Sequence, residues 1–194
     1  MITNDFSLNK EFLNILYNLT VDMKSLLDVG CRDGKNTINL PPKDKLFIDV
    51  ENFNSPEPFI EMNALNILDL NKTFDVITAF DFIEHLTKED GFKFLNIAEK
   101  ITNRVIIFAP QGEVWMHNKH DLDNPHTHKS SWYSHEFEKM GFQVWLEINF
   151  HPSIPAGAFL AWKSFNINEF TIEQYFKNKQ KKGYLNLKCI NLIK

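Results

Sequence analysis

Five of the chain's seven histidines lie in the stretch MHNKHDLDNPHTHKSSWYSH, residues 116–135. An imidazole has a pKa near neutrality, so these side chains suit general acid–base catalysis or metal binding. The stretch contains neither HExxH nor CxxC, and spacings within a loop fix no ligand geometry. We therefore expect no metal here, and a solvated polar loop is the alternative to a catalytic one. The pairs of potential metal ligands are His117 with His120, Asp123 with His126, and His126 with His128, with Asp121 as a further oxygen donor.

A second stretch that could do chemistry is SLLDVGCRDG, Ser25 to Gly34. An apolar run that ends in glycine is typical of a buried parallel strand followed by a tight turn. We expect the turn to lead into a helix, whose first N–H groups attract carboxylates or phosphates. Asp49 ends a second apolar strand and could accept hydrogen bonds from ribose hydroxyls. The alternative is that the glycines serve only the turn.

Short apolar runs, typical of buried strands, alternate along the chain with segments whose apolar residues have helical periodicity. Such alternation predicts an open α/β sheet with helices on both faces and a ligand at the carboxyl ends of the strands. Two late strands, 142–150 and 157–165, are too close in sequence for a helical crossover and should form an antiparallel hairpin. Earlier strands are expected at 25–30, 45–50, 58–63, 74–80 and 104–110, and helices at 8–20, 88–102 (capped by Thr87) and 135–140 (capped by Ser134 and stopped by Gly141).

Length and composition limit the classes of protein to consider. We expect a single domain with an N-terminal helix (1–23), a core (24–165) and a C-terminal extension (166–194). The net charge is −4 and the basic residues are scattered, which argues against a nucleic-acid partner. No apolar run approaches the ~20 residues of a membrane span, and the start of the chain has no signal-peptide pattern. Two cysteines form no disulfide framework, so we expect a cytoplasmic protein; its oligomeric state is not indicated.

Five stretches resemble, in order, the motifs of class I S-adenosylmethionine-dependent methyltransferases. They are LLDVGCRDG, FIDV, MNAL, FDVITAFDFIEHL and VIIFAPQGE. The resemblance implies a Rossmann-like sheet of seven strands, mostly parallel with the last strand antiparallel. It also implies that S-adenosylmethionine is the cofactor and lies over the carboxyl ends of the first four strands. This chain departs from the family pattern at Arg32, in place of a glycine, and at Asn63, in place of an aspartate. Because Arg32 also breaks the GxGxxG fingerprint, an NAD-dependent oxidoreductase is disfavoured.

The resemblance implies roles for individual residues. Asp28 and the turn from Gly30 through Cys31 and Arg32 to Gly34 would hold the methionine part, Asp49 the ribose, and Asn63 with Ala64 the adenine, while Asp81 and Phe82 would lie beside the transferred methyl group. Three alternatives stay open. Asp28 could merely satisfy backbone N–H groups of the turn, and Phe82 could belong to the core. His85 could orient the helix that begins near Lys88 rather than join Asp81 in the catalytic set.

The histidine-rich stretch resembles a segment found in a subset of these methyltransferases, often from cell-surface glycan pathways. That segment has Asn-Pro, then His-x-Ser-x-Trp, then a helix that ends in Gly-Phe, and it singles out His128 as a catalytic residue. A loop as long as 112–131 suits an active-site cover, and Trp115, Trp132 and Tyr133 could stack on the acceptor.

We therefore expect methyl transfer to a hydroxyl of a small-molecule or glycan-precursor acceptor. The alternative is a non-catalytic module that binds the cofactor or a nucleotide. The enzyme is favoured if Asp81, Phe82 and His128 line one cavity with the cofactor site.

Overall fold

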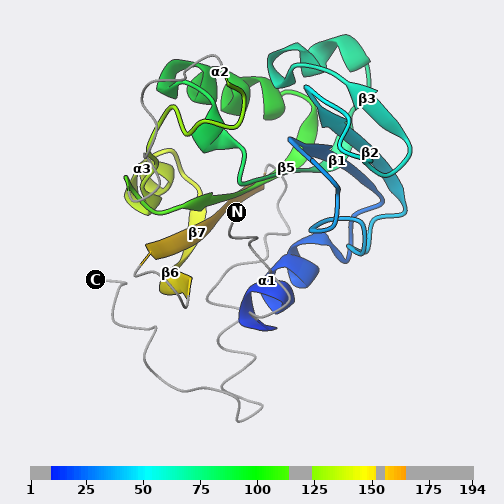
Figure 1. Ribbon diagram of the computed structural model, residues 1–194. Coiled ribbons are helices and arrows are strands. Elements are labelled where there is room, and N and C mark those ends of the chain that lie inside the picture. The colour runs from blue at the N-terminus through cyan, green and yellow to red at the C-terminus, as the bar shows by residue number, and fades with distance from the viewer. Residues whose placement is uncertain (1–9, 114–123, 152–155, 165–194) are drawn as a thin grey trace, which may run out of the picture.

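The computed structural model describes residues 10–113, 124–151 and 156–164, and these form a seven-stranded sheet with the order β3-β2-β1-β4-β5-β7-β6 (Figure 1). Neighbouring strands from β3 to β5 are parallel, whereas β7 is antiparallel to both β5 and β6. This confirms the Rossmann-like sheet and the late antiparallel hairpin. The strands are β1 (Ser25–Val29), β2 (Asp44–Asp49), β3 (Phe59–Glu61), β4 (Phe74–Phe80), β5 (Thr102–Pro110), β6 (Gln143–His151) and β7 (Ala156–Ser164).

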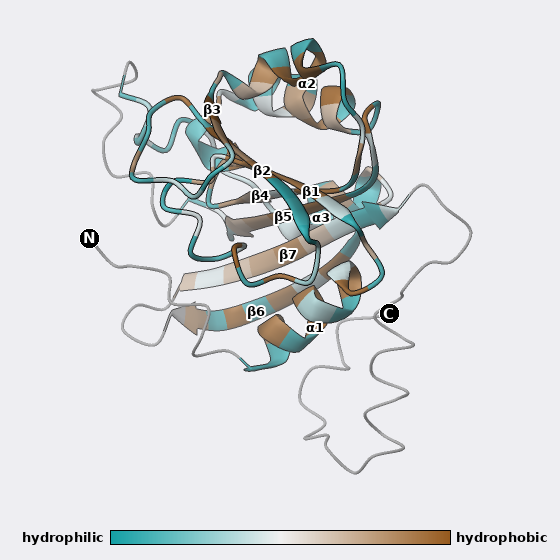
Figure 2. Cartoon of the chain, turned by 90° about the vertical axis from the view of Figure 1, so that its right-hand side faces the viewer, coloured by the Kyte–Doolittle hydropathy of each residue, from teal (hydrophilic) through white to brown (hydrophobic). Residues whose placement is uncertain are grey.

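Helices lie on both faces of the sheet, as expected (Figure 2). On one face, α1 (Lys10–Thr20) buries its apolar side against β1, β4, β5 and the hairpin, and its Phe12 ring meets that of Phe108 edge-on at 5.1 Å. On the other face, α2 (Lys88–Ala98) and α3 (Ser134–Lys139) pack over a second apolar cluster. Two short 3-10 helices, η2 (Ala64–Leu70) and η3 (Ile83–His85), follow β3 and β4.

The helix expected after the glycine turn is absent, because residues 31–43 form turns and no helix. The N–H groups of Thr37 and Ile38 both donate to the carbonyl of Gly34, which closes single turns that do not propagate. Pro41 and Pro42 follow within a few residues; proline lacks an N–H, and it disfavours the α conformation of the residue before it. The connection from β1 to β2 therefore supplies no helix N-terminus for an anionic group.

Two helix boundaries follow local capping chemistry. Thr87 caps α2 as predicted, since its hydroxyl accepts the N–H of Asp90 at 3.1 Å. The N-cap of α3 is Tyr133 and not Ser134, because the Glu136 carboxylate accepts the N–H of Tyr133 at 2.9 Å. Gly141 ends this segment with φ +83°, which glycine adopts without strain.

Among the described residues, no helix is long and apolar enough to cross a membrane. The expected C-terminal extension, 166–194, lies outside the described residues.

Candidate active site at the carboxyl ends of the strands

A cleft of about 1030 Å³ opens at the carboxyl ends of β1, β2 and β4. It is bounded by the turn after β1, the loop after β3, the turn after β4 and residues 124–129 of the loop that follows β5. The expected cofactor residues and the expected catalytic residues therefore share one cavity. Those that line it are Asp28, Gly30, Cys31, Arg32, Asp49, Asn63, Ala64, Asp81, Phe82, His85 and His128; Gly34 does not.

The glycine turn depends on backbone shapes that side chains rarely adopt. Gly30 has φ +67°, and a Cβ added there would overlap the ring of Phe82. Gly34 has φ +64°, and its added Cβ would lie 2.5 Å from Cγ of Pro56. Both glycines thus serve the turn, and Gly30 in addition allows the chain after β1 to approach the turn after β4.

Arg32 keeps the turn although it replaces the family's glycine. Its φ is +51°, so the arginine itself adopts the left-handed conformation. Its N–H donates to Oδ2 of Asp49 at 2.8 Å, and its carbonyl accepts the hydroxyl of Ser55. Its guanidinium carbon lies 5.9 Å from the centre of the Phe53 ring, which also lines the cleft. The substitution therefore changes the wall of the cleft and leaves the turn intact.

Asp49 ends β2 with its carboxylate at the cleft. It accepts the N–H of Arg32 and, at 2.7 Å, that of Val50. Burial raises its pKa, and the two N–H donors oppose that rise. A carboxylate has about four lone-pair sites, so two donors leave acceptor capacity for hydroxyls of a ligand.

Asp28 is buried beside this end of the cleft. Its carboxyl group accepts the hydroxyls of Thr37 and, at 2.8 Å, of Thr78. Burial raises its pKa to about 7, although these two hydrogen bonds act to lower it. The alternative role of satisfying backbone N–H groups is not what the structure shows, because its hydrogen-bond partners are these hydroxyls. Burial likewise raises the pKa of Cys31 to about 12, so its sulfur stays a thiol at neutral pH.

Asn63 and Ala64 follow β3 at the cleft. The Asn63 side chain caps η2 by accepting the N–H of Leu65 at 2.9 Å. Its amide remains exposed, while Ala64 is buried. An amide at this place can present donors to the edge of a ring, whereas the aspartate of the family pattern presents only acceptors when ionised.

The turn after β4 carries Asp81, Phe82 and His85. Asp81 has φ +48°, and its N–H donates to Phe108 at 2.9 Å, which pins the turn to β5. Phe82 meets the ring of Phe94 edge-on at 5.2 Å and also lines the cleft, so it serves both core and site. His85 does not cap α2. Its Nδ1 lies 3.3 Å from the carbonyl of Thr127 in the loop after β5.

Ser130 and Trp132 hold that loop against the turn after β4. The indole N–H of Trp132 donates to the carbonyl of Ile83 at 3.2 Å and to Oγ of Ser130 at 2.9 Å. The Ser130 hydroxyl donates to the carbonyl of Leu86 at 2.8 Å. The His-x-Ser-x-Trp pattern therefore works as an anchor that brings His128 to the cleft.

The structure corrects the expected stacking surface for the acceptor. Part of the loop that was expected to provide it lies outside the described residues. Trp132 is fully buried, so it cannot stack on an acceptor. Tyr133 is half-buried and does not line the cleft. Trp115, His117, His120, Asp121 and Asp123 lie outside the described residues.

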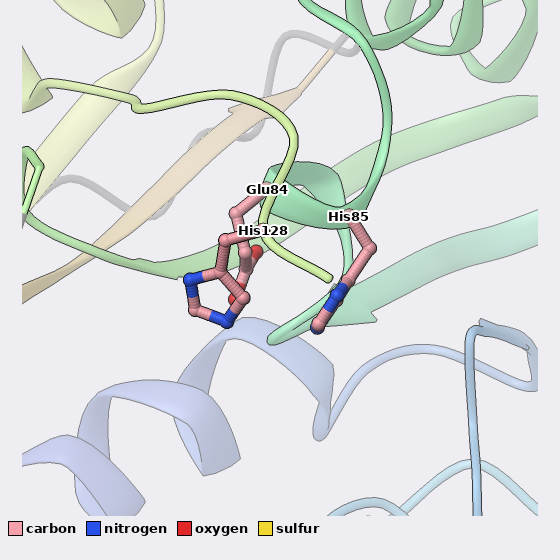
Figure 3. A group of neighbouring side chains, drawn as sticks. All are labelled: Glu84, His85 and His128. Atoms are coloured by element: carbon pink, nitrogen blue, oxygen red, sulfur yellow. The ribbon is translucent and has the colours of Figure 1, made fainter. Parts of the chain in front are cut away.

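Glu84 belongs to the site although the sequence analysis did not single it out. Figure 3 shows Glu84 and His85, from η3, gathered with His128, from the loop. The rings of the two histidines meet edge-on with centroids 4.7 Å apart. Burial raises the pKa of Glu84, and Asp81 raises it further. Burial and, to a smaller extent, the neighbouring His128 lower the pKa of His85 to about 4. The only available signal was the Glu-His pair in the FDFIEHL motif.

Comparisons with known proteins agree with this geometry. A family model described as "Methyltransferase domain" matches residues 4–147. No curated protein matches the chain in sequence.

Solved structures share the fold at low sequence identity. The SAM-dependent methyltransferase from Archaeoglobus fulgidus is 16% identical with a TM-score of 0.55, over 83% of this chain and 95% of that one. The N-methyltransferase NodS from Bradyrhizobium japonicum WM9 is 13% identical with a TM-score of 0.59, over 82% of this chain and 97% of that one. The small RNA methyltransferase HEN1 is 13% identical with a TM-score of 0.55, over 89% of this chain but only 27% of that one. The chain therefore belongs to the methyltransferase-domain family and has the fold of S-adenosylmethionine-dependent methyltransferases.

Proposed function

We propose that the protein transfers a methyl group from S-adenosylmethionine to a hydroxyl of a small-molecule or glycan-precursor acceptor. One observation carries the proposal: a single cleft is lined both by the glycine turn with Asp49 and by Asp81, Phe82 and His128. A module that only held a cofactor would not require titratable groups at the far end of the cavity. The continuity of the cavity therefore favours an enzyme over the non-catalytic alternative.

The cofactor half of the cleft suits a nucleoside that lacks a pyrophosphate. The Asp49 carboxylate would accept the ribose hydroxyls, and Asn63 with Ala64 would face the adenine. The turn from Gly30 to Arg32 would run beside the methionine part, whose ammonium and sulfonium charges suit the nearby carboxyl of Asp28. Bound S-adenosylmethionine supplies an electrophilic methyl group on a positively charged sulfur.

The acceptor half positions the nucleophile and its proton. A lone pair of the acceptor oxygen forms the new C–O bond while the C–S bond breaks and its electron pair returns to sulfur. Much of the rate would come from holding the oxygen in line with that bond. The hydroxyl proton must leave, and His128, which lines the cleft beside His85, would accept it or orient the acceptor.

The charge of the cleft favours a small acceptor over a nucleic acid. Among its described lining residues, six carry carboxyl groups and three are lysine or arginine. Such a surface offers few basic side chains, from which affinity for nucleic acids chiefly comes. The lining carboxyl groups belong to Asp28, Asp33, Asp49, Glu51, Asp81 and Glu84, and the basic residues are Arg32, Lys35 and Lys129.

The proposal is tested by incubating the protein with methyl-labelled S-adenosylmethionine and fractionated cell extracts. We expect label in small or glycan-linked molecules, in a form that alkali does not release, because an ether is stable where an ester is not. His135→Ala should transfer label like the wild type, since His135 is exposed on α3 and does not line the cleft. Label that enters only RNA or protein would contradict the proposed acceptor.

A further inference from the structure

The buried carboxylate of Glu84 has an oxygen that lacks a partner. Glu84 is 2% exposed, and its Oε2 accepts no hydrogen bond from any described residue. Leaving a buried carboxylate oxygen unsatisfied is costly, so native proteins provide it with a donor, a water or a cation. Asp81 adds a second acidic group nearby and raises the pKa of Glu84 further. Two acidic groups thus lie close together at this end of the cleft.

Two imidazoles complete a set of ligand atoms around that oxygen. One ligand atom each from Glu84, His85 and His128 lies within 4.8 Å of the others. Ligands held about 2.0–2.2 Å from a common cation are at most about 4.4 Å apart, so small side-chain rotations would close the site. The three side chains come from two segments, which the anchor at Ser130 and Trp132 holds together.

The hydrogen bond of His85 presents the correct nitrogen. A carbonyl only accepts, so the contact of Nδ1 with the carbonyl of Thr127 places the ring proton on Nδ1. Nε2 then carries a lone pair. Metal-binding histidines commonly make such a second contact, which fixes the tautomer and the direction of the ring.

We propose that Glu84, His85 and His128 bind one divalent transition-metal ion at the acceptor end of the cleft. Two imidazoles and one carboxylate suit Mn²⁺, Fe²⁺, Co²⁺ or Zn²⁺ better than Mg²⁺ or Ca²⁺, which prefer oxygen ligands alone. The expectation of no metal rests on spacings within the histidine-rich loop. That reasoning did not include Glu84 and His85, which the fold brings to His128 from outside the loop.

The role of the ion in catalysis rests on the proposed function. Three protein ligands would leave coordination positions for an acceptor, since all three side chains line the same cavity as Asp81 and Phe82. A cation there would lower the pKa of an acceptor hydroxyl, whose proton would leave to solvent. The oxygen lone pair would then form the C–O bond as the C–S bond breaks and its electron pair returns to sulfur. His128 would then act as a ligand and not as the base.

The site is tested by titrating Co²⁺ into the full chain, made without a histidine tag and stripped with a chelator. We expect one equivalent to bind, with visible absorption bands that Zn²⁺ abolishes by competition. Glu84→Gln and His128→Ala should each weaken binding at least about 10-fold, a loss in the range that even indirect changes around metal sites cause. His135→Ala is the matched control and should bind like the wild type, since His135 is exposed and does not line the cleft.

Folding and function are separated from metal binding by two further readouts. Metal-free Glu84→Gln should melt close to the wild type, because glutamine keeps the size of the buried side chain and has no charge to desolvate, yet Co²⁺ should raise its melting temperature less. S-adenosylmethionine binding, measured by calorimetry, tests the proposed function separately and should persist in both ligand variants. The site is refuted if the wild type binds no Co²⁺, or if Glu84→Gln and His128→Ala bind it as tightly as the wild type.

Discussion

The indole N–H of Trp132 donates to the main-chain carbonyl of Ile83 at 3.2 Å, and this contact joins the loop after β5 to the turn after β4. The same turn carries Glu84 and His85, and the same loop carries His128. The placement of His128 at the cleft therefore depends on a buried ring that never touches the cavity.

Trp132→Phe should lower the free energy of unfolding by about 2–4 kcal/mol, because it removes buried volume and the indole hydrogen bonds to Ile83 and Ser130. Urea denaturation measures the change. Turnover per folded molecule should fall as well, since His128 loses its support. Trp145→Phe is the control, because Trp145 is also buried but packs on the opposite face with α1. It should cost stability without lowering turnover. If folded Trp132→Phe protein keeps the turnover of the wild type, the hydrogen bonds of Trp132 are not needed to position His128.

Gly30→Ala should cost about 2–4 kcal/mol, the sum of left-handed backbone strain and displacement of the Phe82 ring. Gly112→Ala offers a comparison with similar backbone, φ +78°, but its added Cβ lies 3.1 Å from Tyr133 and needs a smaller shift. We expect it to cost about 1–2 kcal/mol in the same urea experiment. Cofactor affinity should fall for Gly30→Ala alone. Equal losses of stability in the two variants would show that the approach of Phe82 does not matter.

Asp28 should make the wild type less stable as the pH rises from about 4 to about 7. Its folded-state pKa is raised from 3.8 to about 7, so in that window the folded chain keeps a proton that the unfolded chain has lost. The contribution of Asp28 to the free energy of unfolding is therefore largest at acid pH. It falls by at most about 1.4 kcal/mol for each unit by which the pH rises. Urea denaturation of wild type and Asp28→Asn at pH 5, 6, 7 and 8 isolates it. The difference between the two proteins should change with pH below 7 and level off above it. A constant difference would contradict the raised pKa.

His128→Ala should leave cofactor affinity nearly unchanged and reduce turnover about 10²–10⁴-fold, as expected for loss of a general base. Steady-state kinetics with the identified acceptor, together with calorimetry, provides both numbers. Excess Mn²⁺ or Co²⁺ should restore part of the rate if His128 is a metal ligand, and none if it is the base. If melting temperature and turnover fall together, and a stabilising buffer recovers the activity, the side chain only ties the loop in place.

Much of the fold could be predicted because it rests on local patterns. Apolar runs located the strands, and the short connection after β6 predicted the antiparallel hairpin. The helix expected after the glycine turn was wrong, because the expectation rested on the turn alone and Pro41 and Pro42 follow too soon for a helix to extend. The N-cap of α3 was misplaced by one residue because the reciprocal bond from Glu136 decides it.

The site could be predicted only where strand ends determine it. Asp28, Asp49 and the glycine turn follow from the rule that ligands lie at the carboxyl ends of parallel strands. Glu84 could not be paired with His128, because their proximity depends on how a long loop folds back on the turn after β4. The bonds of Ser130 and Trp132 set that path, and sequence spacing contains no information on them.

The most direct test of the central claim is calorimetric titration of the wild type and Asp49→Ala with S-adenosylmethionine and, separately, with NAD. We expect binding of S-adenosylmethionine in the micromolar range, typical of small ligands. Asp49→Ala should weaken it by roughly 1.5–3 kcal/mol, through loss of charge-assisted hydrogen bonds to the ribose. NAD should not bind, because Arg32 stands where the pyrophosphate needs glycine. A wild-type protein that binds NAD and ignores S-adenosylmethionine would contradict the account.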